Sequence, residues 1–172
     1  MADDLERQAR ILLVDDSMMD MELALEAFSG LGFATTVDVA LGGREALDRL
    51  LGVTRQEDGT PFATPDIILL DLKMPGVDGF EVLRQVKGSP ALRQIPVIIL
   101  TSSREEGDRA MSYDTGANSY LVKPLSFDGF IDVIHQIGDY WLILNVRPPG
   151  MPARCRPETD AGVRQPHAGS PA

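Results

Sequence analysis

Four short apolar runs, each ending at a polar side chain, constrain the fold of this sequence most. The runs lie at residues 11–14, 67–70, 97–100 and 120–122. Runs of this length, rich in Ile, Leu and Val, indicate strands buried on both faces of a parallel sheet. The polar residues that follow them are Asp15, Asp16, Asp71, Thr101 and Lys123. Ligands of open α/β sheets bind beyond the carboxyl ends of the strands, so these side chains are predicted to meet at one sheet edge.

Helical patterns alternate with strand patterns along the chain. The predicted strands span residues 10–14, 35–39, 66–70, 96–100 and 118–122. The predicted helices span residues 18–30, 43–52, 78–87, 104–114 and 126–143. Such an alternation, with short loops and right-handed crossovers, forms a parallel sheet. We therefore predict an α/β fold: a doubly wound five-stranded parallel sheet of order 2-1-3-4-5, flavodoxin-like, with helices on both faces.

Capping residues mark several of the helix boundaries. Ser17 and Asp78 stand at positions that suit helix N-caps, and Glu81 would complete a capping box with Asp78. The glycines at 42–43 open the second predicted helix, and Gly116 ends the fourth.

Two segments fall outside the alternation. Residues 53–65 form a polar connection longer than the usual 2–6 residues, and either a hairpin-like or a mobile excursion would explain it. From Arg147 onward the chain has six prolines in 26 residues and no Leu, Ile or Phe, which is too little apolar surface to offset the entropy of ordering. We predict a domain at 1–146 and a proline-rich flexible tail at 147–172.

Charge and composition narrow the classes of partner. The net charge is −10, and because residues 147–172 carry about +2, the remaining residues carry about −12. Such a body repels nucleic acid and attracts Mg²⁺ or basic protein surfaces, although solubility alone explains the charge equally well. The sequence has no membrane-length apolar stretch, no apolar signal-peptide core and a single cysteine, Cys155. We therefore expect a cytoplasmic protein that binds neither nucleic acid nor membrane.

The carboxylates at the predicted edge indicate metal-assisted phosphoryl transfer. Asp15 and Asp16 end the first strand and Asp71 ends the third, and these strands are neighbours in the predicted sheet. Oxygen-only ligands suit Mg²⁺, which neutralises charge on a transferring phosphoryl group, and one carboxylate can act as the nucleophile. Lys123 can pair with that carboxylate, and Thr101 can donate to a phosphoryl oxygen. A single acid at a strand end more often only caps a loop, but the five residues together favour the functional interpretation.

Over about residues 9–145 the sequence resembles the receiver domain of two-component response regulators. The resemblance is carried by the segments 11–16, 69–79, 99–102 and 120–124. The site residues that it implies are the phospho-acceptor Asp71; the Mg²⁺ ligands Asp15, Asp16, Asp71 and the backbone carbonyl of Lys73; the phosphoryl contacts Thr101 and Lys123; and the switch aromatic Tyr120. In receivers the bond corresponding to Lys123–Pro124 is typically cis, so a cis bond is expected here.

Residues 111–124, 140–145 and 53–65 are similar to parts of the single-domain regulators that are paired with bacterial phytochrome kinases. The resemblance implies that a sensor histidine kinase, here a bacteriophytochrome, donates the phosphoryl group. Output would run through protein contact, because no DNA-binding module follows the receiver in this sequence. The protein would be a signalling protein and not an enzyme, catalysing only its own phosphorylation and dephosphorylation.

Two other functions are alternatives to this one. An aspartate-nucleophile phosphatase of the haloacid-dehalogenase type needs an Asp-x-Asp pattern after the first strand and a cap insertion, whereas Asp15 and Asp16 are adjacent. A flavodoxin-like flavin carrier needs a Ser/Thr/Gly phosphate loop at the same place, where these acids would repel the phosphate.

The last predicted helix has a wider apolar arc than a sheet requires. A surface helix needs an apolar stripe of ~100°, but here apolar residues cover roughly half the circumference. We assign Phe127, Ile131 and Ile134 to the sheet. The remaining apolar residues repeat at coiled-coil spacing and predict a homodimer interface, with cover by the tail or the fourth helix as the alternative. The predicted interface residues are Phe130, Val133, Ile137, Tyr140 and Leu144.

Overall fold

Five parallel strands form the centre of the structure, a computed structural model that describes residues 8–149. The strands are β1 (Ala9–Val14), β2 (Thr35–Ala40), β3 (Ile67–Leu70), β4 (Val97–Thr101) and β5 (Ser119–Val122). Their order in the sheet is β2-β1-β3-β4-β5, as predicted. Each predicted strand agrees with the observed one to within a residue at either end.

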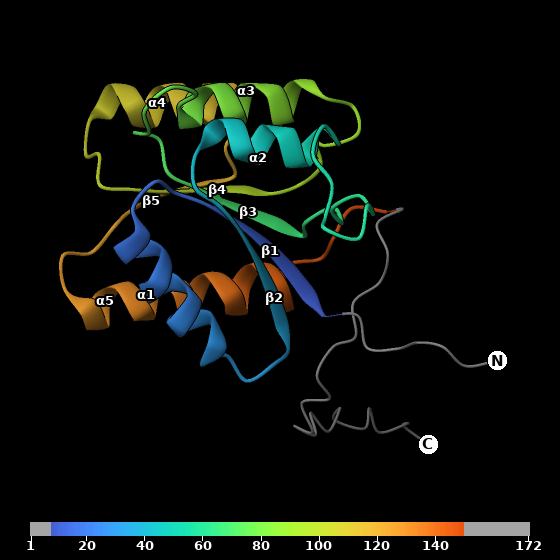
Figure 1. Ribbon diagram of the computed structural model, residues 1–172. Coiled ribbons are helices and arrows are strands. Elements are labelled where there is room, and N and C mark those ends of the chain that lie inside the picture. Colours follow the sequence, from blue (N-terminus) through green and yellow to red (C-terminus); the bar gives the residue numbers. More distant parts are fainter. Residues whose placement is uncertain (1–7, 150–172) are drawn as a thin grey trace, which may run out of the picture.

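Helices cover both faces of the sheet (Figure 1). They are α1 (Met18–Ser29), α2 (Gly43–Leu50), α3 (Gly79–Gly88), α4 (Glu106–Thr115) and α5 (Phe127–Ile137), followed by a π-helical segment, η1 (Gly138–Leu144). In Figure 1, α2, α3 and α4 lie above the sheet, and α1 and α5 lie below it. The predicted fold class is therefore confirmed. Within residues 8–149, no helix is long and apolar enough to cross a membrane.

Two apolar layers attach these helices to the sheet. Leu12 and Leu83 belong to the layer under α2 and α3, whereas Ile11, Phe28 and Ile134 belong to the layer over α1 and α5. Neighbouring residues of β1 face opposite layers because strand side chains alternate. Burial on both sides explains why the strand sequences are continuous apolar runs.

Backbone hydrogen bonds continue beyond the strands and align the residues that follow them. The amide of Asp15 donates to the carbonyl of Ala40 at 3.2 Å, and the amide of Asp71 donates to the carbonyl of Val14 at 3.0 Å. The amide of Lys123 donates to the carbonyl of Thr101 at 2.8 Å. The polar residues that follow the strands are therefore fixed by the sheet itself.

Most of the predicted caps are present. Ser17 Oγ accepts from the amide of Asp20, and Asp78 Oδ1 accepts from the amide of Glu81 at 3.0 Å. Gly116 ends α4 in the left-handed region, with φ of 110°. The capping box is wrong in its second half, because the Glu81 carboxylate binds Arg84 and Gln85 instead of turning back to the N-cap. A guanidinium one turn along the helix competes for the carboxylate that the box requires.

The long connection at 53–65 contains a hairpin-like turn. An antiparallel bridge joins Arg55 to Pro61, and the amide of Gln56 donates to the carbonyl of Thr60 at 2.9 Å. Phe62 then returns to the fold under Arg49, whose guanidinium carbon lies 4.7 Å from the centre of the ring. This agrees with the hairpin-like alternative.

The last helix presents a different side to the sheet from the one predicted. Phe130 and Ile137 are only 4% and 3% exposed and pack in the core with Ile134, whereas Phe127 is 51% exposed. The prediction that Phe130 and Ile137 are left free after the sheet is covered is therefore wrong. Packing against α1 decides which part of a wide apolar arc faces inward, and helical periodicity alone does not encode that choice.

The predicted single helix 126–143 also changes type at Gly138. From there η1 is π-helical, and its end is closed by the amide of Asn145 donating to the carbonyl of Tyr140 at 2.7 Å. A side chain at Gly138 would press on Leu31, so glycine permits this close contact. Tyr140 and Leu144 remain exposed, by 52% and 68%, and Val133 is half-buried.

A buried aspartate lies at the amino edge of the sheet, just before β3. Asp66 is 1% exposed, accepts from the amide of Arg10 at 2.7 Å and pairs with the Arg147 guanidinium at 2.5 Å. Arg147, where the predicted tail begins, is thus attached to the fold. The rest of the predicted tail, including Cys155, falls almost entirely outside the described residues, and its flexibility stays a prediction.

Candidate functional site

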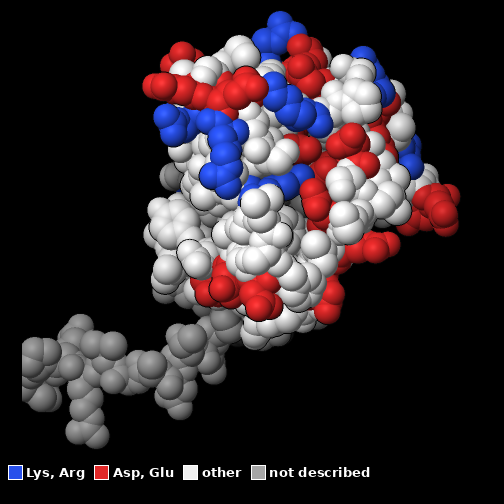
Figure 2. Space-filling model, turned by 90° about the vertical axis from the view of Figure 1, so that its left-hand side faces the viewer, with Lys and Arg blue, Asp and Glu red and all other residues white. Residues whose placement is uncertain are grey.

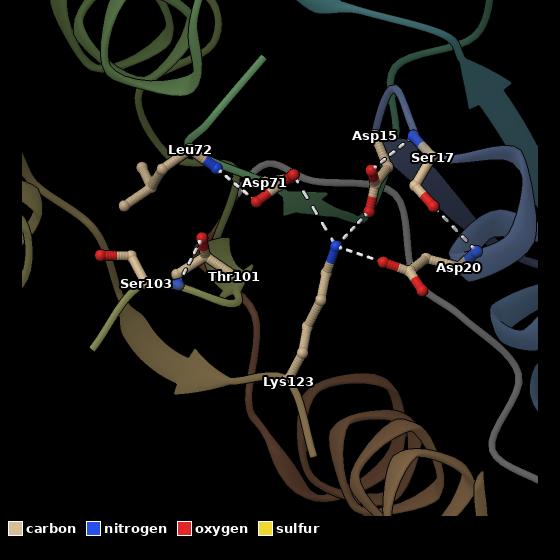
Figure 3. Close-up of polar contacts among 8 residues, drawn as sticks. All are labelled: Asp15, Ser17, Asp20, Asp71, Leu72, Thr101, Ser103 and Lys123. Atoms are coloured by element: carbon tan, nitrogen blue, oxygen red, sulfur yellow. Dashed lines mark hydrogen bonds and ion pairs between the residues drawn. The ribbon is translucent and has the colours of Figure 1, made fainter. Parts of the chain in front are cut away.

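The carboxyl edge of the sheet brings three predicted carboxylates together. One carboxylate oxygen from each of Asp15, Asp16 and Asp71 lies within 4.8 Å of the other two. Asp15 and Asp71 are 4% and 7% exposed, and Asp16 is open to solvent. Asp15 Oδ1 accepts from the amide of Ser17 at 2.9 Å, and Asp71 Oδ1 accepts from the amide of Leu72 at 2.9 Å. Figure 3 shows the side chains of Asp15 and Asp71 converging from the ends of β1 and β3.

Lys123 reaches the same point from the end of β5. Its Nζ donates to Asp15 Oδ2 at 2.6 Å and to Asp20 Oδ2 at 2.8 Å, and it lies 3.7 Å from Asp71 Oδ2 (Figure 3). No described residue follows a cis peptide bond, so the bond between Lys123 and Pro124 is trans. The predicted cis bond is therefore wrong. The trans form is the more stable one for such bonds by about 0.5–1 kcal/mol, and the long lysine side chain reaches the carboxylates from it.

Burial and charge act against each other in this cluster. Burial raises the pKa of Asp71, Lys123 opposes that rise, and the neighbouring Asp15 adds to it. Burial alone would lower the pKa of Lys123, but its hydrogen bonds to Asp15 and Asp20 outweigh that effect, and the pKa is raised. The lysine therefore remains a cation among four carboxylates, which leaves a net negative site.

The donor set fits a small divalent cation. Mg²⁺ binds oxygen at about 2.1 Å, so opposite ligands of an octahedron lie about 4.2 Å apart, close to the spread of the three carboxylate oxygens. The single positive charge of Lys123 offsets only part of the negative charge of the three carboxylates. Asp16 is exposed, so a cation could reach this group from the solvent.

The remaining predicted residues lie on β4, on β5 and in the loop after β3. Thr101 is fully buried at the end of β4, and its Oγ1 accepts from the amide of Ser103 at 3.3 Å. The hydroxyl of Tyr120 donates to the carbonyl of Ser103 at 3.1 Å. Lys73 extends its ammonium away from the carboxylates to Asp108 Oδ2 at 3.0 Å. Thr101 and Tyr120 thus both bind the loop that connects β4 to α4.

Two acidic residues at this edge were not identified from the sequence. Asp20 binds Lys123, and Asp108 binds both Lys73 and Ser103, whose Oγ lies 2.5 Å from Asp108 Oδ2. Each lies in the first turn of a helix that follows a site strand, where acids are common for helix-dipole reasons alone. Side chains in a helix point toward its N-terminus, and that direction is the signal that could have identified them.

Uncharged surface adjoins the acidic cluster. Figure 2 views the side of the molecule at the left of Figure 1, where acidic side chains lie beside a broad uncharged area. Exposed apolar residues occur where α1 and α5 begin, at the same carboxyl edge: Met18, Met19, Leu125 and Phe127.

Comparisons with known proteins agree with this geometry. The family model of the response regulator receiver domain matches residues 11–135 of this sequence. Response regulator Rcp1 of Synechocystis is 34% identical over 143 residues, covering 83% of this chain and 95% of Rcp1. The structure of its Mn²⁺-bound form superimposes with a TM-score of 0.73, covering 81% of this chain and 99% of the other.

Two further structures come from phytochrome-associated regulators. The phosphorylated cyanobacterial phytochrome response regulator RcpA is 32% identical with a TM-score of 0.76, covering 83% of this chain and 99% of RcpA. The bacteriophytochrome response regulator AtBRR is 47% identical with a TM-score of 0.63, covering 81% of this chain and 99% of AtBRR. The chain therefore belongs to the response regulator receiver domain family, whose members are signalling proteins of two-component systems.

Proposed function

We propose that Asp71 accepts a phosphoryl group from the phosphohistidine of a sensor histidine kinase. In this step the P–N bond to histidine breaks, a P–O bond to an Asp71 carboxylate oxygen forms, and the histidine nitrogen recovers a proton. The single observation that carries the proposal is the position of Lys123 Nζ, 3.7 Å from Asp71 Oδ2 within a cluster of carboxylates. Asp71 Oδ1 is already engaged by a backbone amide, so we assign Oδ2 as the attacking oxygen.

Mg²⁺ is the cofactor that this site suits. Asp15, Asp16 and Asp71 would hold it, joined by the carbonyl of Lys73 as the resemblance to receivers implies, and its charge would offset that of the incoming phosphoryl group. The Mn²⁺-bound form of Rcp1 supports a divalent cation in a related protein.

Phosphorylation would be transmitted through the loop that connects β4 to α4. Lys123 pairs with one phosphoryl oxygen and Thr101 donates its hydroxyl to another. Thr101 now accepts a hydrogen bond from Ser103, and Tyr120 binds the same residue, so a shift of Thr101 changes the anchor of Tyr120. Tyr120 then acts as the switch aromatic.

The partners are proteins. Similarity to RcpA and AtBRR supports a bacteriophytochrome kinase as donor. The exposed apolar side chains at the carboxyl edge, such as Met19 at 70% exposure and Leu125 at 98%, offer that kinase a surface at the edge that holds Asp71. The acidic charge of the body disfavours DNA as a direct target, so output runs through protein contact.

Asp71→Asn is expected to abolish labelling by acetyl phosphate and by bacteriophytochrome kinases, because the amide cannot act as the nucleophile. Wild-type labelling should also vanish in EDTA. Asp58→Asn, in the exposed hairpin at 53–65, is the matched control and should label like the wild type. Undiminished labelling of Asp71→Asn would contradict the assignment, and transfer from other kinases but from no bacteriophytochrome would contradict the proposed donor.

A homodimer also forms part of the proposal, through the exposed end of the last helix. Tyr140, Leu144 and Val146 are 52%, 68% and 82% exposed, and Val133, seven residues before Tyr140, is half-buried. Leu144→Glu should therefore shift the protein toward monomer in sedimentation at micromolar concentration, with labelling of Asp71 retained. A wild type that is monomeric with and without the phosphoryl mimic beryllofluoride would contradict the dimer.

A further inference from the structure

Asp20 is the closest carboxylate to Lys123 that the cluster of Asp15, Asp16 and Asp71 does not include. Its Oδ2 lies 2.8 Å from Lys123 Nζ, and its side chain is 30% exposed. Asp71, the acceptor, lies 0.9 Å further away, at 3.7 Å. In this structure the ammonium is therefore bonded to Asp15 and Asp20 and only near Asp71, as Figure 3 shows.

The sequence around Asp20 places it there for a local reason. Ser17 caps α1 by accepting from the amide of Asp20, which fixes that residue in the first turn. Its carboxylate points back toward the N-terminus of the helix, and therefore toward the carboxyl edge of the sheet. Lys123 comes from β5, so this contact joins segments 103 residues apart.

We infer that Asp20 is a positioning residue that holds Lys123 away from Asp71 in the unphosphorylated protein and releases it when a phosphoryl group is present. This inference rests on the proposed phosphorylation of Asp71. A phosphoryl group adds negative charge at Asp71, so the ammonium gains more by turning toward it than by keeping Asp20. Asp20 thus stabilises the resting arrangement and opposes the phosphorylated one.

The inference predicts opposite effects on two ligands. In Asp20→Asn, which keeps the shape of the side chain and removes its charge, beryllofluoride should bind about fivefold more tightly at saturating Mg²⁺, since a partly exposed ion pair is worth about 1 kcal/mol. Mg²⁺ alone should bind more weakly, because one nearby negative charge is lost. A merely structural defect would weaken the binding of both ligands.

The position of the lysine can be followed directly through the Nζ resonance of Lys123 in ¹⁵N NMR spectra. Without ligand, this resonance should differ between the wild type and Asp20→Asn. With beryllofluoride and Mg²⁺ bound, the two proteins should converge, because Lys123 then has the same partner in both. Glu22→Gln is the matched control: Glu22 is exposed and lies about 200° around the helix from Asp20, so it should change neither measurement.

The outcomes separate this inference from the function on which it rests. A wild type that binds no beryllofluoride overturns the proposed function, and the inference with it. A wild type that binds it, with Asp20→Asn indistinguishable from Glu22→Gln or weaker in binding, overturns the inference alone. The same holds if the Lys123 resonances of the wild type and Asp20→Asn differ as much in the bound state as in the free one.

Discussion

Ile137→Ala is expected to lower the free energy of unfolding by about 2–5 kcal/mol, because it leaves a cavity between α5 and the sheet. Ile137 is 3% exposed and belongs to the apolar layer over α1 and α5. Leu144→Ala is the matched control. It removes a similar amount of apolar side chain from a residue that is 68% exposed and should change that free energy by less than about 0.5 kcal/mol.

Urea unfolding of the two variants measures the difference, at a concentration low enough for the monomer. Equal losses of stability would mean that Ile137 lies on the surface and that the layer is held by other residues. A large loss at Leu144 alone would reverse the two assignments.

Gly79→Ala should be the second strongly destabilising change, by about 3 kcal/mol, because it overpacks the backbone next to Asp71. A methyl group at this position would collide with the backbone carbonyl oxygen of Asp71 and with Cα of Leu72. The amide of Gly79 also donates to the carbonyl of Leu72 at 2.9 Å, so the start of α3 has little freedom to move away. Labelling of Asp71 should fall together with the stability.

Gly88→Ala provides the comparison at the other end of the same helix. Gly88 is exposed, and nothing lies within 4 Å of an added methyl group. It should stabilise the protein by about 0.5–1 kcal/mol, because alanine restricts the unfolded chain more than glycine does. Both variants can be followed by thermal unfolding, and a Gly79→Ala protein as stable as the wild type would show that the α3 start adapts to the methyl group.

The sheet was predictable because its signal is local. A run such as 67–70 is apolar without interruption, and its short length favours a strand buried on both faces over a buried helix. The same logic placed Asp15, Asp71, Thr101 and Lys123 at one edge, since parallel strands carry the residues that follow them to a common side.

The features that sequence reasoning missed depend on contacts between distant segments. Phe130 and Phe127 have the same chemistry, and only the packing of α5 against α1 decides that the first is buried and the second exposed. In the sequence, Asp20 is an ordinary acid in the first turn of a helix. Its contact with the site depends on Lys123, which comes from the distant strand β5. The isomer of the Lys123–Pro124 bond likewise has no local signal.

The strand β3 has an aspartate at each end, with opposite surroundings. Asp66 is buried with its charge paired to Arg147, and Asp71, five residues later and about 17 Å away, belongs to the carboxylate cluster. Arg147 therefore lies at the edge remote from the carboxylate cluster. A fluorescent protein or an affinity handle fused shortly after this arginine would begin on that remote side, which leaves the approach to Asp71 open for a histidine kinase. Arg147 itself should be kept in any shortened version, because removing it would remove the guanidinium that pairs with the buried carboxylate of Asp66.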